Sequence, residues 1–410
     1  MKRAITPLIL FAIVLLATQL LQKYTFIYQE LDGLFLWTDD YFDQMHQQSF
    51  ALAGIIGDYI TQFFRFRFMA AAIVALEVVL VFIMTRHILS RMHLGWDVLA
   101  TLCACIFWLV IAFAPTAKTG VAVLLVLTPV FVLSLFFRLR EARPMKKGWI
   151  EWASAAALAL VCVAVLVFHP DISRRERTSA LRTGVVTGNW DLVLSVATHE
   201  AIREDRSMLP FAMLALGMKG QLGNRIFDYD IQCEDDFDMV EQEDSYVSLF
   251  YKAFLYENLQ CPNEAVHNFF QLATVQPHGQ SFMVLRQLVA EHYRMGNYAL
   301  ASKYLAILSK SSCHGDFVRR YETLLARGTP READSLAFRK TVPLINHDPF
   351  RNLFLLDANG LRTALLVDRV LCTMIIRGEW DMFRSLFMTV ADNFPVVPKY
   401  YRRELEGWYQ

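Results

Sequence analysis

The chain has 410 residues, of which 40 are basic and 40 acidic, so its net charge at neutral pH is zero. Basic and acidic residues number 13 and 10 up to residue 170, and 27 and 30 beyond it. Neither part has the basic excess of a nucleic-acid-binding protein, so we expect no nucleic acid among the partners.

Five apolar stretches in residues 1–170 approach the length of a membrane-spanning helix. A span needs roughly 20 mostly apolar residues, and the candidates are residues 4–22, 68–85, 98–115, 120–137 and 153–168. No small-residue cleavage site follows the first stretch, which therefore reads as an uncleaved helix and not as a signal peptide. The sequence predicts a bundle of about five transmembrane helices over residues 1–170, in contact with the lipid bilayer.

The basic residues of the short loops predict an orientation. With the N-terminus in the cytoplasm, nine Lys and Arg residues lie on the cytoplasmic side and four on the other side, as the positive-inside rule requires. Five spans then place the C-terminal part outside the cytoplasm, at a bacterial inner membrane. Arg174, Arg175 and Arg177 follow the fifth stretch on the outer side and oppose this orientation.

The loop between the first two predicted spans, residues 23–67, is rich in aromatic side chains, which favour the headgroup region of a membrane. We interpret residues 49–64 as an amphipathic helix that lies on the membrane surface.

Asp39 and Asp40 form an acidic pair in the same loop. The pair resembles the carboxylates in the first extracytoplasmic loop of polytopic glycosyltransferases that use lipid-linked sugars. That resemblance implies a catalytic base or metal ligand at Asp39 or Asp40. The alternative is a pair of solvated acids near the start of a helix.

Residues 171–410 have helical periodicity throughout and contain a recurrent turn motif. The motif is glycine, any residue, then an aromatic residue, and it begins at Gly188, Gly296 and Gly378, with Trp190, Tyr298 and Trp380 as its aromatic members. A glycine can end one helix and an aromatic side chain can fill the space between two helices. The sequence thus predicts a soluble α-helical domain of helical hairpins over residues 171–410.

One hairpin, residues 282–310, resembles the tetratricopeptide repeat. The resemblance rests on Leu285, Leu288, Tyr293, Gly296, Tyr298, Ala301, Tyr304 and Leu308. It implies that Ala301 is the small residue at which the two helices approach, and that the domain binds proteins. Ala265 and Ala301 are 36 residues apart, near the 34-residue period of these repeats.

Motifs for nucleotide binding, metalloproteolysis and serine hydrolysis do not occur in the sequence, and its cysteines and histidines have no metal-ligand spacing. We therefore expect no cofactor and no metal.

The whole layout resembles a group of uncharacterised bacterial multi-span membrane proteins with a C-terminal tetratricopeptide-like domain. The carrying segments are residues 34–42 and 58–64 together with the hairpins. Chains of that group run longer at the C-terminus, so this chain is expected to be a short version. Our first hypothesis is a membrane-anchored, non-catalytic scaffold that binds a protein or cell-envelope partner; the alternative is an enzyme of the glycosyltransferase type that uses Asp39 or Asp40.

Overall fold

The structure is a computed structural model. It describes residues 5–91, 97–136, 148–231, 233, 235–238, 245–276, 281–327, 351, 354–356 and 363–406. Within these residues the regular structure is helical, without strands, which confirms the predicted all-α class. The chain divides into two units, Met1–Ser179 with Lys310–Cys313, and Ala180–Ser309 with His314–Gln410.

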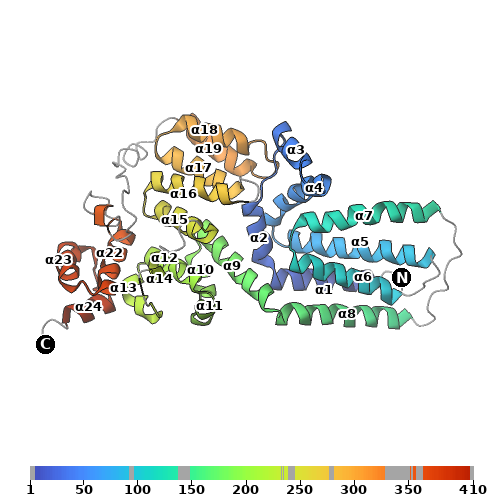
Figure 1. Ribbon diagram of the computed structural model, residues 1–410, viewed down its shortest axis with the longest axis horizontal. Coiled ribbons are helices and arrows are strands. Elements are labelled where there is room, and N and C mark those ends of the chain that lie inside the picture. The colour runs from blue at the N-terminus through green and yellow to red at the C-terminus, as the bar shows by residue number, and fades with distance from the viewer. Residues whose placement is uncertain are drawn as a thin grey trace. The chain divides into compact units, whose positions relative to one another are not determined.

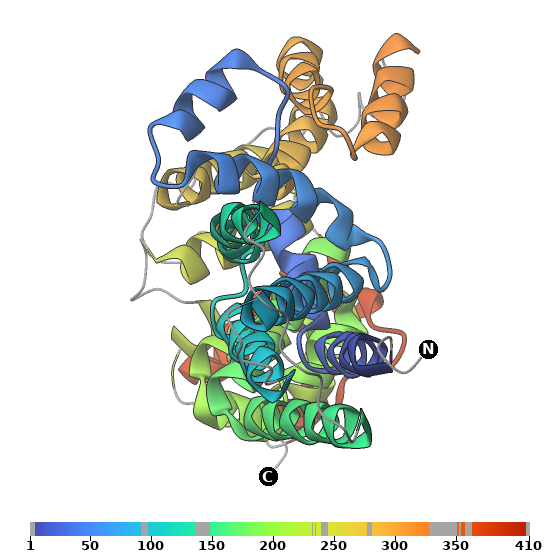
Figure 2. The ribbon, with the colours of Figure 1, turned by 90° about the vertical axis from the view of Figure 1, so that its right-hand side faces the viewer.

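Five apolar helices form the bundle of the first unit (Figure 1). They are α1 (Ile5–Leu21), α5 (Met69–Arg91), α6 (Asp97–Phe113), α7 (Ala117–Phe136) and α8 (Gly148–Phe168). Helix α5 packs against α1, α6 and α7, while α8 packs against α1 and α6, as the end-on view of Figure 2 shows. Small side chains such as Ala75, Ala104 and Ala155 are fully buried between the helices. Small residues at these contacts let the helix backbones approach closely.

The prediction of about five spans is wrong. Within the described residues, two helices are long and apolar enough to cross a membrane, Met69–Ser90 and Ala117–Phe136. Two bent pairs of helices could each form one further span, which would raise the number to four. The pairs are Ile5–Leu21 with Lys23–Asp32, and Trp152–Phe168 with Pro170–Thr187. Helix α6 has 17 residues, which extend about 25 Å at 1.5 Å per residue, less than a hydrocarbon core of roughly 30 Å.

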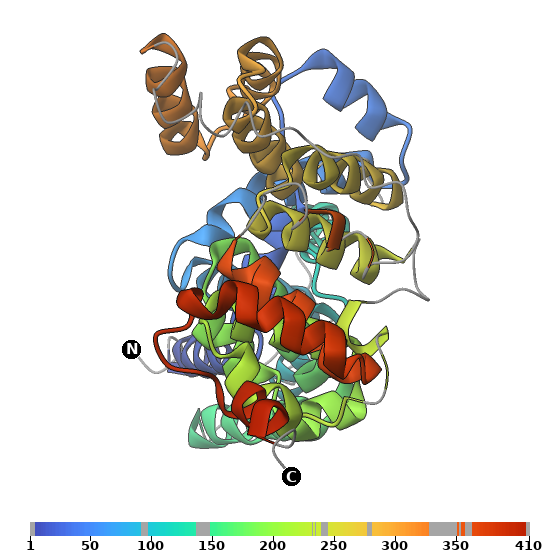
Figure 3. The same ribbon diagram turned by 90° about the vertical axis from the view of Figure 1, so that its left-hand side faces the viewer.

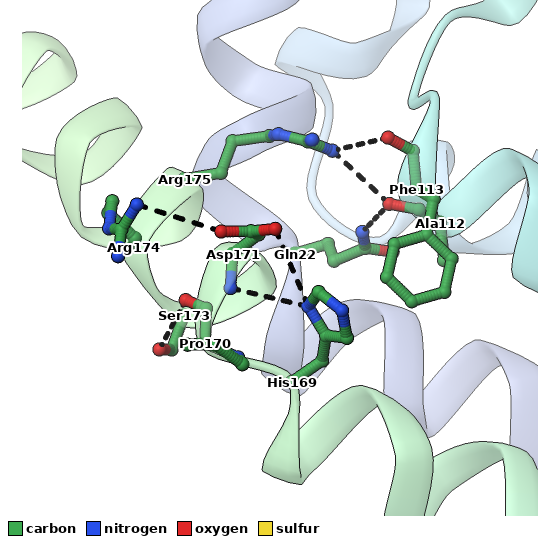
Figure 4. A network of polar contacts seen from close by, with 9 residues as sticks. All are labelled: Gln22, Ala112, Phe113, His169, Pro170, Asp171, Ser173, Arg174 and Arg175. Atoms are coloured by element: carbon green, nitrogen blue, oxygen red, sulfur yellow. Dashed lines mark hydrogen bonds and ion pairs between the residues drawn. The ribbon is translucent and has the colours of Figure 1, made fainter.

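Polar contacts hold the end of α6 where the chain bends between α8 and α9 (Pro170–Thr187), as Figure 4 shows. The Gln22 amide donates to the Ala112 carbonyl at 2.8 Å. The Arg175 guanidinium donates to the carbonyls of Ala112 and Phe113 at 3.3 and 3.0 Å. The last four carbonyls of a helix lack partners within it, and cations are favourable there. Arg175, one of the arginines that oppose the predicted orientation, thus has a structural role at this helix end.

The neighbouring residue Glu176 binds the start of α2 (Lys23–Asp32). Its carboxylate accepts hydrogen bonds from the backbone N–H groups of Tyr24 and Thr25 at 2.7 and 2.8 Å. A negative charge is favourable where the first N–H groups of a helix are unpaired. Two consecutive residues of α9 therefore secure the end of α6 and the start of α2.

The loop of residues 23–67 folds into α2, α3 (Asp39–His46), α4 (Ala51–Thr61) and the short helix η2 (Gln62–Arg65). Helix α4 packs against α7, and a Cβ atom on Gly57 would lie only 2.7 Å from the backbone nitrogen of Lys118. The helix predicted over residues 49–64 is divided between α4 and η2, and its place on a membrane surface stays a prediction. The buried Phe35 ring lies 5.0 to 5.3 Å from the rings of Trp37, Tyr41 and Tyr59.

The segment Lys310–Cys313 belongs to the first unit and is hydrogen-bonded to the loop of residues 23–67. The Trp37 backbone N–H donates to the Lys310 carbonyl at 3.0 Å, and the Trp37 indole N–H donates to the Ser312 hydroxyl at 2.7 Å.

The second unit is built from short helices. In chain order they are α10 (Trp190–Val196), α11 (His199–Glu204), η3 (Arg206–Met208), α12 (Leu209–Met218), α13 (Leu222–Arg225), η4 (Ile226–Asp228), α14 (Asp235–Asp238), α15 (Tyr246–Asn258), α16 (Pro262–Val275), α17 (Phe282–Arg294), α18 (Tyr298–Leu308), α19 (Gly315–Ala326), α22 (Ala364–Arg377), α23 (Trp380–Val390), η5 (Ala391–Asn393) and α24 (Lys399–Glu406). Helices α15 to α18 stack in order, each on the next. At the other end of the unit α22 pairs with α23, and α24 packs on α13; Figure 3 brings these C-terminal helices to the front.

The hairpins α15–α16 and α17–α18 share the same features at an interval of 36 residues. Ser245 and Ser281 cap the first helices, and their hydroxyls accept hydrogen bonds from the backbone N–H groups three residues later. Gln260 and Gly296 occupy the turns with φ of 63° and 74°. Ala265 and Ala301 are fully buried five residues after these turns. The two hairpins therefore share a serine cap, a positive-φ turn and a buried alanine at the same spacing.

Candidate functional site

The predicted turn residues all lie between helices. Gly188, Gly296 and Gly378 have φ of 67°, 74° and 71°, in the left-handed region that favours glycine. Trp190, Tyr298 and Trp380 are the first residues of α10, α18 and α23. The fifth residue after each glycine, Val193, Ala301 or Phe383, is fully buried. This position is therefore fully buried in all three turns, although its side chain varies in size from Ala to Phe.

Asp39 and Asp40 lie in the first turn of α3, after the cap residue Thr38, whose hydroxyl accepts from the Tyr41 N–H. Both side chains are exposed. Neither lines the pocket described below. Acidic residues at a helix start are favoured by the helix dipole, which accounts for the pair without catalysis.

A pocket of about 310 Å³ opens on the surface of the second unit beside the stacked hairpins. It is formed by the end of α12, the turn between α15 and α16, and the last turn of α17. Its lining consists of Met218, Glu257, Asn258, Gln260, Pro262, Glu291 and Arg294. Gln260 is the non-glycine residue with positive φ in that turn, and such backbone strain is concentrated at functional sites.

Two buried carboxylates share one guanidinium in this pocket. The side chains of Glu291 and Glu257 are 1% and 15% exposed. Arg294 donates to Glu291 at 2.5 Å and lies 3.7 Å from Glu257. The Gln287 amide donates to the other Glu257 oxygen at 3.0 Å. With both acids ionised, the charge of these three side chains sums to −1.

Burial dominates the titration of this pair. It raises the pKa of Glu291 to about 8, helped by the charge of Glu257 and opposed by that of Arg294. Burial also raises the pKa of Glu257, against the opposing charges of Arg294 and Arg286 and the Gln287 hydrogen bond. The pocket thus gains negative charge as the pH rises through neutrality, because desolvation penalises the charged form.

The pocket combines two carboxylates, one guanidinium and apolar surface. Among the described residues no group of three or more His, Cys, Asp or Glu side chains could hold a metal ion. Burial raises the pKa of the neighbouring Cys261 thiol to about 12, so this thiol is not a nucleophile at neutral pH. A partly apolar cavity that becomes net negative when Glu291 ionises suits a cationic group carried on an apolar stem, because that cation favours the ionised form.

A family model described as "Family of unknown function (DUF6057)" matches residues 1–119 and 110–365. The chain belongs to the DUF6057 family. The DUF6057 match includes parts of both structural units and contains every residue that lines the pocket. Neither a curated protein nor a solved structure matches the chain.

The pocket is not apparent from the sequence because its acids come from separate helices. Glu257 lies in the last turn of α15 and Glu291 lies in α17, and only the packing of these helices brings the two acids to one guanidinium. A signal was nonetheless present, since Glu291 and Arg294 have the i, i+3 spacing of an ion pair on one helix face.

Proposed function

We propose that this protein is a non-catalytic, membrane-anchored scaffold whose second unit binds a protein or cell-envelope partner. The observation that carries the proposal is the pocket of Glu257, Glu291 and Arg294 at the surface of the hairpin stack. The bundle of α1, α5, α6, α7 and α8 supplies the anchor, through the two to four helices that could cross a membrane.

The hairpin stack supports partner binding through its likeness to tetratricopeptide repeats. Its two hairpins, 36 residues apart, each have a capped first helix, a positive-φ turn and a buried alanine. Stacked hairpins form extended surfaces of the kind that bind peptides and proteins. We propose that the partner inserts a Lys or Arg side chain into the pocket, where its charge would favour ionised Glu291.

A photoreactive side chain at Met218 of the full-length protein tests this proposal in cells. Met218 lines the pocket and is 36% exposed. We expect one discrete protein adduct, reduced at least several-fold when Glu257 and Glu291 are both replaced by Gln, because the carboxylates attract the cation. Met388 of α23 is the matched control, since it is 75% exposed and outside the pocket. Equal adducts at both positions, or an adduct indifferent to the two Gln substitutions, would refute the proposal.

We further propose that the N-terminus is cytoplasmic and that the second unit lies outside the cytoplasm at the inner membrane. Lys2 and Arg3 precede the first apolar stretch, which favours a cytoplasmic N-terminus. The proposed orientation requires an odd number of crossings, and three falls within the range of two to four. A reporter fused after Gln410 should be active only outside the cytoplasm; activity in the cytoplasm would show an even number of crossings.

A further inference from the structure

Two cysteines from different helices lie side by side inside the bundle of the first unit. Cys105 belongs to α6 and Cys162 to α8, two helices that pack against each other (Figure 1). The two thiol side chains share a hydrogen bond. The residues are 2% and 5% exposed and belong to one hydrophobic core. The pair is therefore a buried dithiol that spans a helix–helix contact.

Small side chains hold α6 and α8 close together around this pair. Ala155 and Ala159 precede Cys162 at helical spacing, so the three residues share one face of α8. Both alanines are fully buried, and so is Ala104, which precedes Cys105 on α6. Small residues let helix backbones approach closely, and a disulfide needs Cβ atoms about 4 Å apart. The packing thus supplies the approach that an interhelical disulfide requires.

The same two segments are joined by polar contacts at the end of the bundle. Arg175 of α9, the helix that follows α8, donates to the carbonyls of Ala112 and Phe113 at the end of α6. Cys105 and Cys162 each lie about two turns before the end of their helix. A bond between them would add a covalent link beside the Arg175 contact and fix α8 against α6 just before the chain bends into α9.

The surroundings of the pair are apolar. Among the described residues, no charged side chain acts on either thiol. Ile106 and Val161, the sequence neighbours of the two cysteines, are 52% and 59% exposed. With the bundle in a membrane, as proposed above, these side chains face acyl chains. An oxidant dissolved in the lipid therefore reaches the pair more readily than one dissolved in water.

We propose that Cys105 and Cys162 form a redox-active dithiol that a membrane quinone oxidises to a disulfide. Two S–H bonds break and one S–S bond forms. The two electrons and two protons released convert the quinone to a quinol, so the step needs no further reactant. A quinone fits the site because it is a two-electron oxidant that is confined to the bilayer. This assignment adds a redox site and is independent of the partner proposed for the second unit.

Oxidation of the purified full-length protein in phosphatidylcholine nanodiscs tests the proposal. The reduced protein is treated with decylubiquinone or with oxidised glutathione, which is water-soluble. The remaining thiols are alkylated, and cross-linked peptides are identified by mass spectrometry. We expect decylubiquinone to join Cys105 to Cys162, with an equivalent loss of quinone absorbance, at least several-fold faster than oxidised glutathione. Absence of this peptide from both samples would overturn the disulfide, and equal rates would overturn the quinone as its oxidant.

Substitutions locate the site. Cys105→Ser and Cys162→Ser should each abolish the cross-linked peptide and the quinol formed with it. Cys103→Ser is the matched control, because Cys103 lies on the same helix α6 and is only half-buried; it should leave both signals unchanged. A loss in Cys103→Ser as large as in Cys105→Ser would show that a different pair is oxidised and overturn the proposal. The wild-type peptide identifies the pair directly, so the test does not depend on the folding of the Ser variants.

Discussion

Glu291→Gln should remove most of the pH dependence of unfolding of the second unit between about pH 4.5 and pH 8. Burial raises the pKa of Glu291 from 4.5 to about 8 in the folded protein. Between these values the folded state holds a proton that the unfolded state has released, so the stability of the wild type falls as the pH rises. Each unit of pKa difference corresponds to about 1.4 kcal/mol, which bounds the effect at about 5 kcal/mol.

The Gln variant should therefore be more stable than the wild type above pH 8 and nearly equal to it below pH 5. Two features make the gain in unfolding free energy smaller than the upper limit of about 5 kcal/mol. Arg294 loses an ionised partner, although it is 43% exposed and so remains partly solvated. Glu257 keeps some pH dependence of its own, because burial raises its pKa as well. The double variant with Glu257→Gln should show the flattest profile.

Urea unfolding of the full-length protein at a series of pH values gives the measurement. Each sample is equilibrated and then pulse-labelled with deuterium at one fixed pH, and peptides from α15 to α17 are followed by mass spectrometry. Glu322→Gln, on an exposed position of α19, is the control and should leave the wild-type slope unchanged. A wild-type slope in Glu291→Gln would mean that Glu291 ionises in the folded state as it does in the unfolded chain.

Local sequence patterns predicted the helices and their turns well, because both depend on neighbouring residues. The turn glycines Gly188, Gly296 and Gly378 ended helices through a backbone conformation that the residue type itself favours. The apolar stretches became helices for the same reason, since their hydrophobic content is visible in any short window.

The number of spans could not be read in the same way, because length and bending depend on distant contacts. Helix α1 ends at Leu21, and the chain turns by 71° into α2. There, Gln22 donates to the end of α6 and Glu176 accepts from the start of α2, partners 90 and about 150 residues away. The acidic pocket could not be predicted from the sequence for the same physical reason, because only helix packing brings Glu257 and Arg294 together.

Tyr401→Phe should destabilise the second unit by about 1.5 to 3 kcal/mol at pH 8, the range for a hydrogen bond to a charged group, and by less at pH 5. Tyr401 of α24 is fully buried, and its hydroxyl donates to the Asp368 carboxylate of α22 at 3.0 Å. Burial raises the pKa of Asp368 to about 6, and this hydrogen bond opposes the rise. Without the hydroxyl the pKa should rise further, so stability would fall over a wider range as the pH increases.

The Cys372 thiol, which is fully buried and 3.3 Å from the Tyr401 hydroxyl, reports the release of α24. The protein is equilibrated at pH 5 or pH 8 and then labelled at one fixed pH with a water-soluble thiol reagent, and the labelled peptide is followed by mass spectrometry. Labelling of Cys372 should be faster in Tyr401→Phe than in the wild type, mainly in the pH 8 sample.

Tyr400→Phe is the matched control, because Tyr400 donates to Asp228, whose side chain is 37% exposed and can bind water instead. Adding Asp368→Asn should abolish the pH dependence of the Tyr401→Phe effect, since the buried group is then neutral at every pH. If the labelling of Tyr401→Phe differed from the wild type equally at both pH values, the hydroxyl would act through packing alone and not through the charge of Asp368.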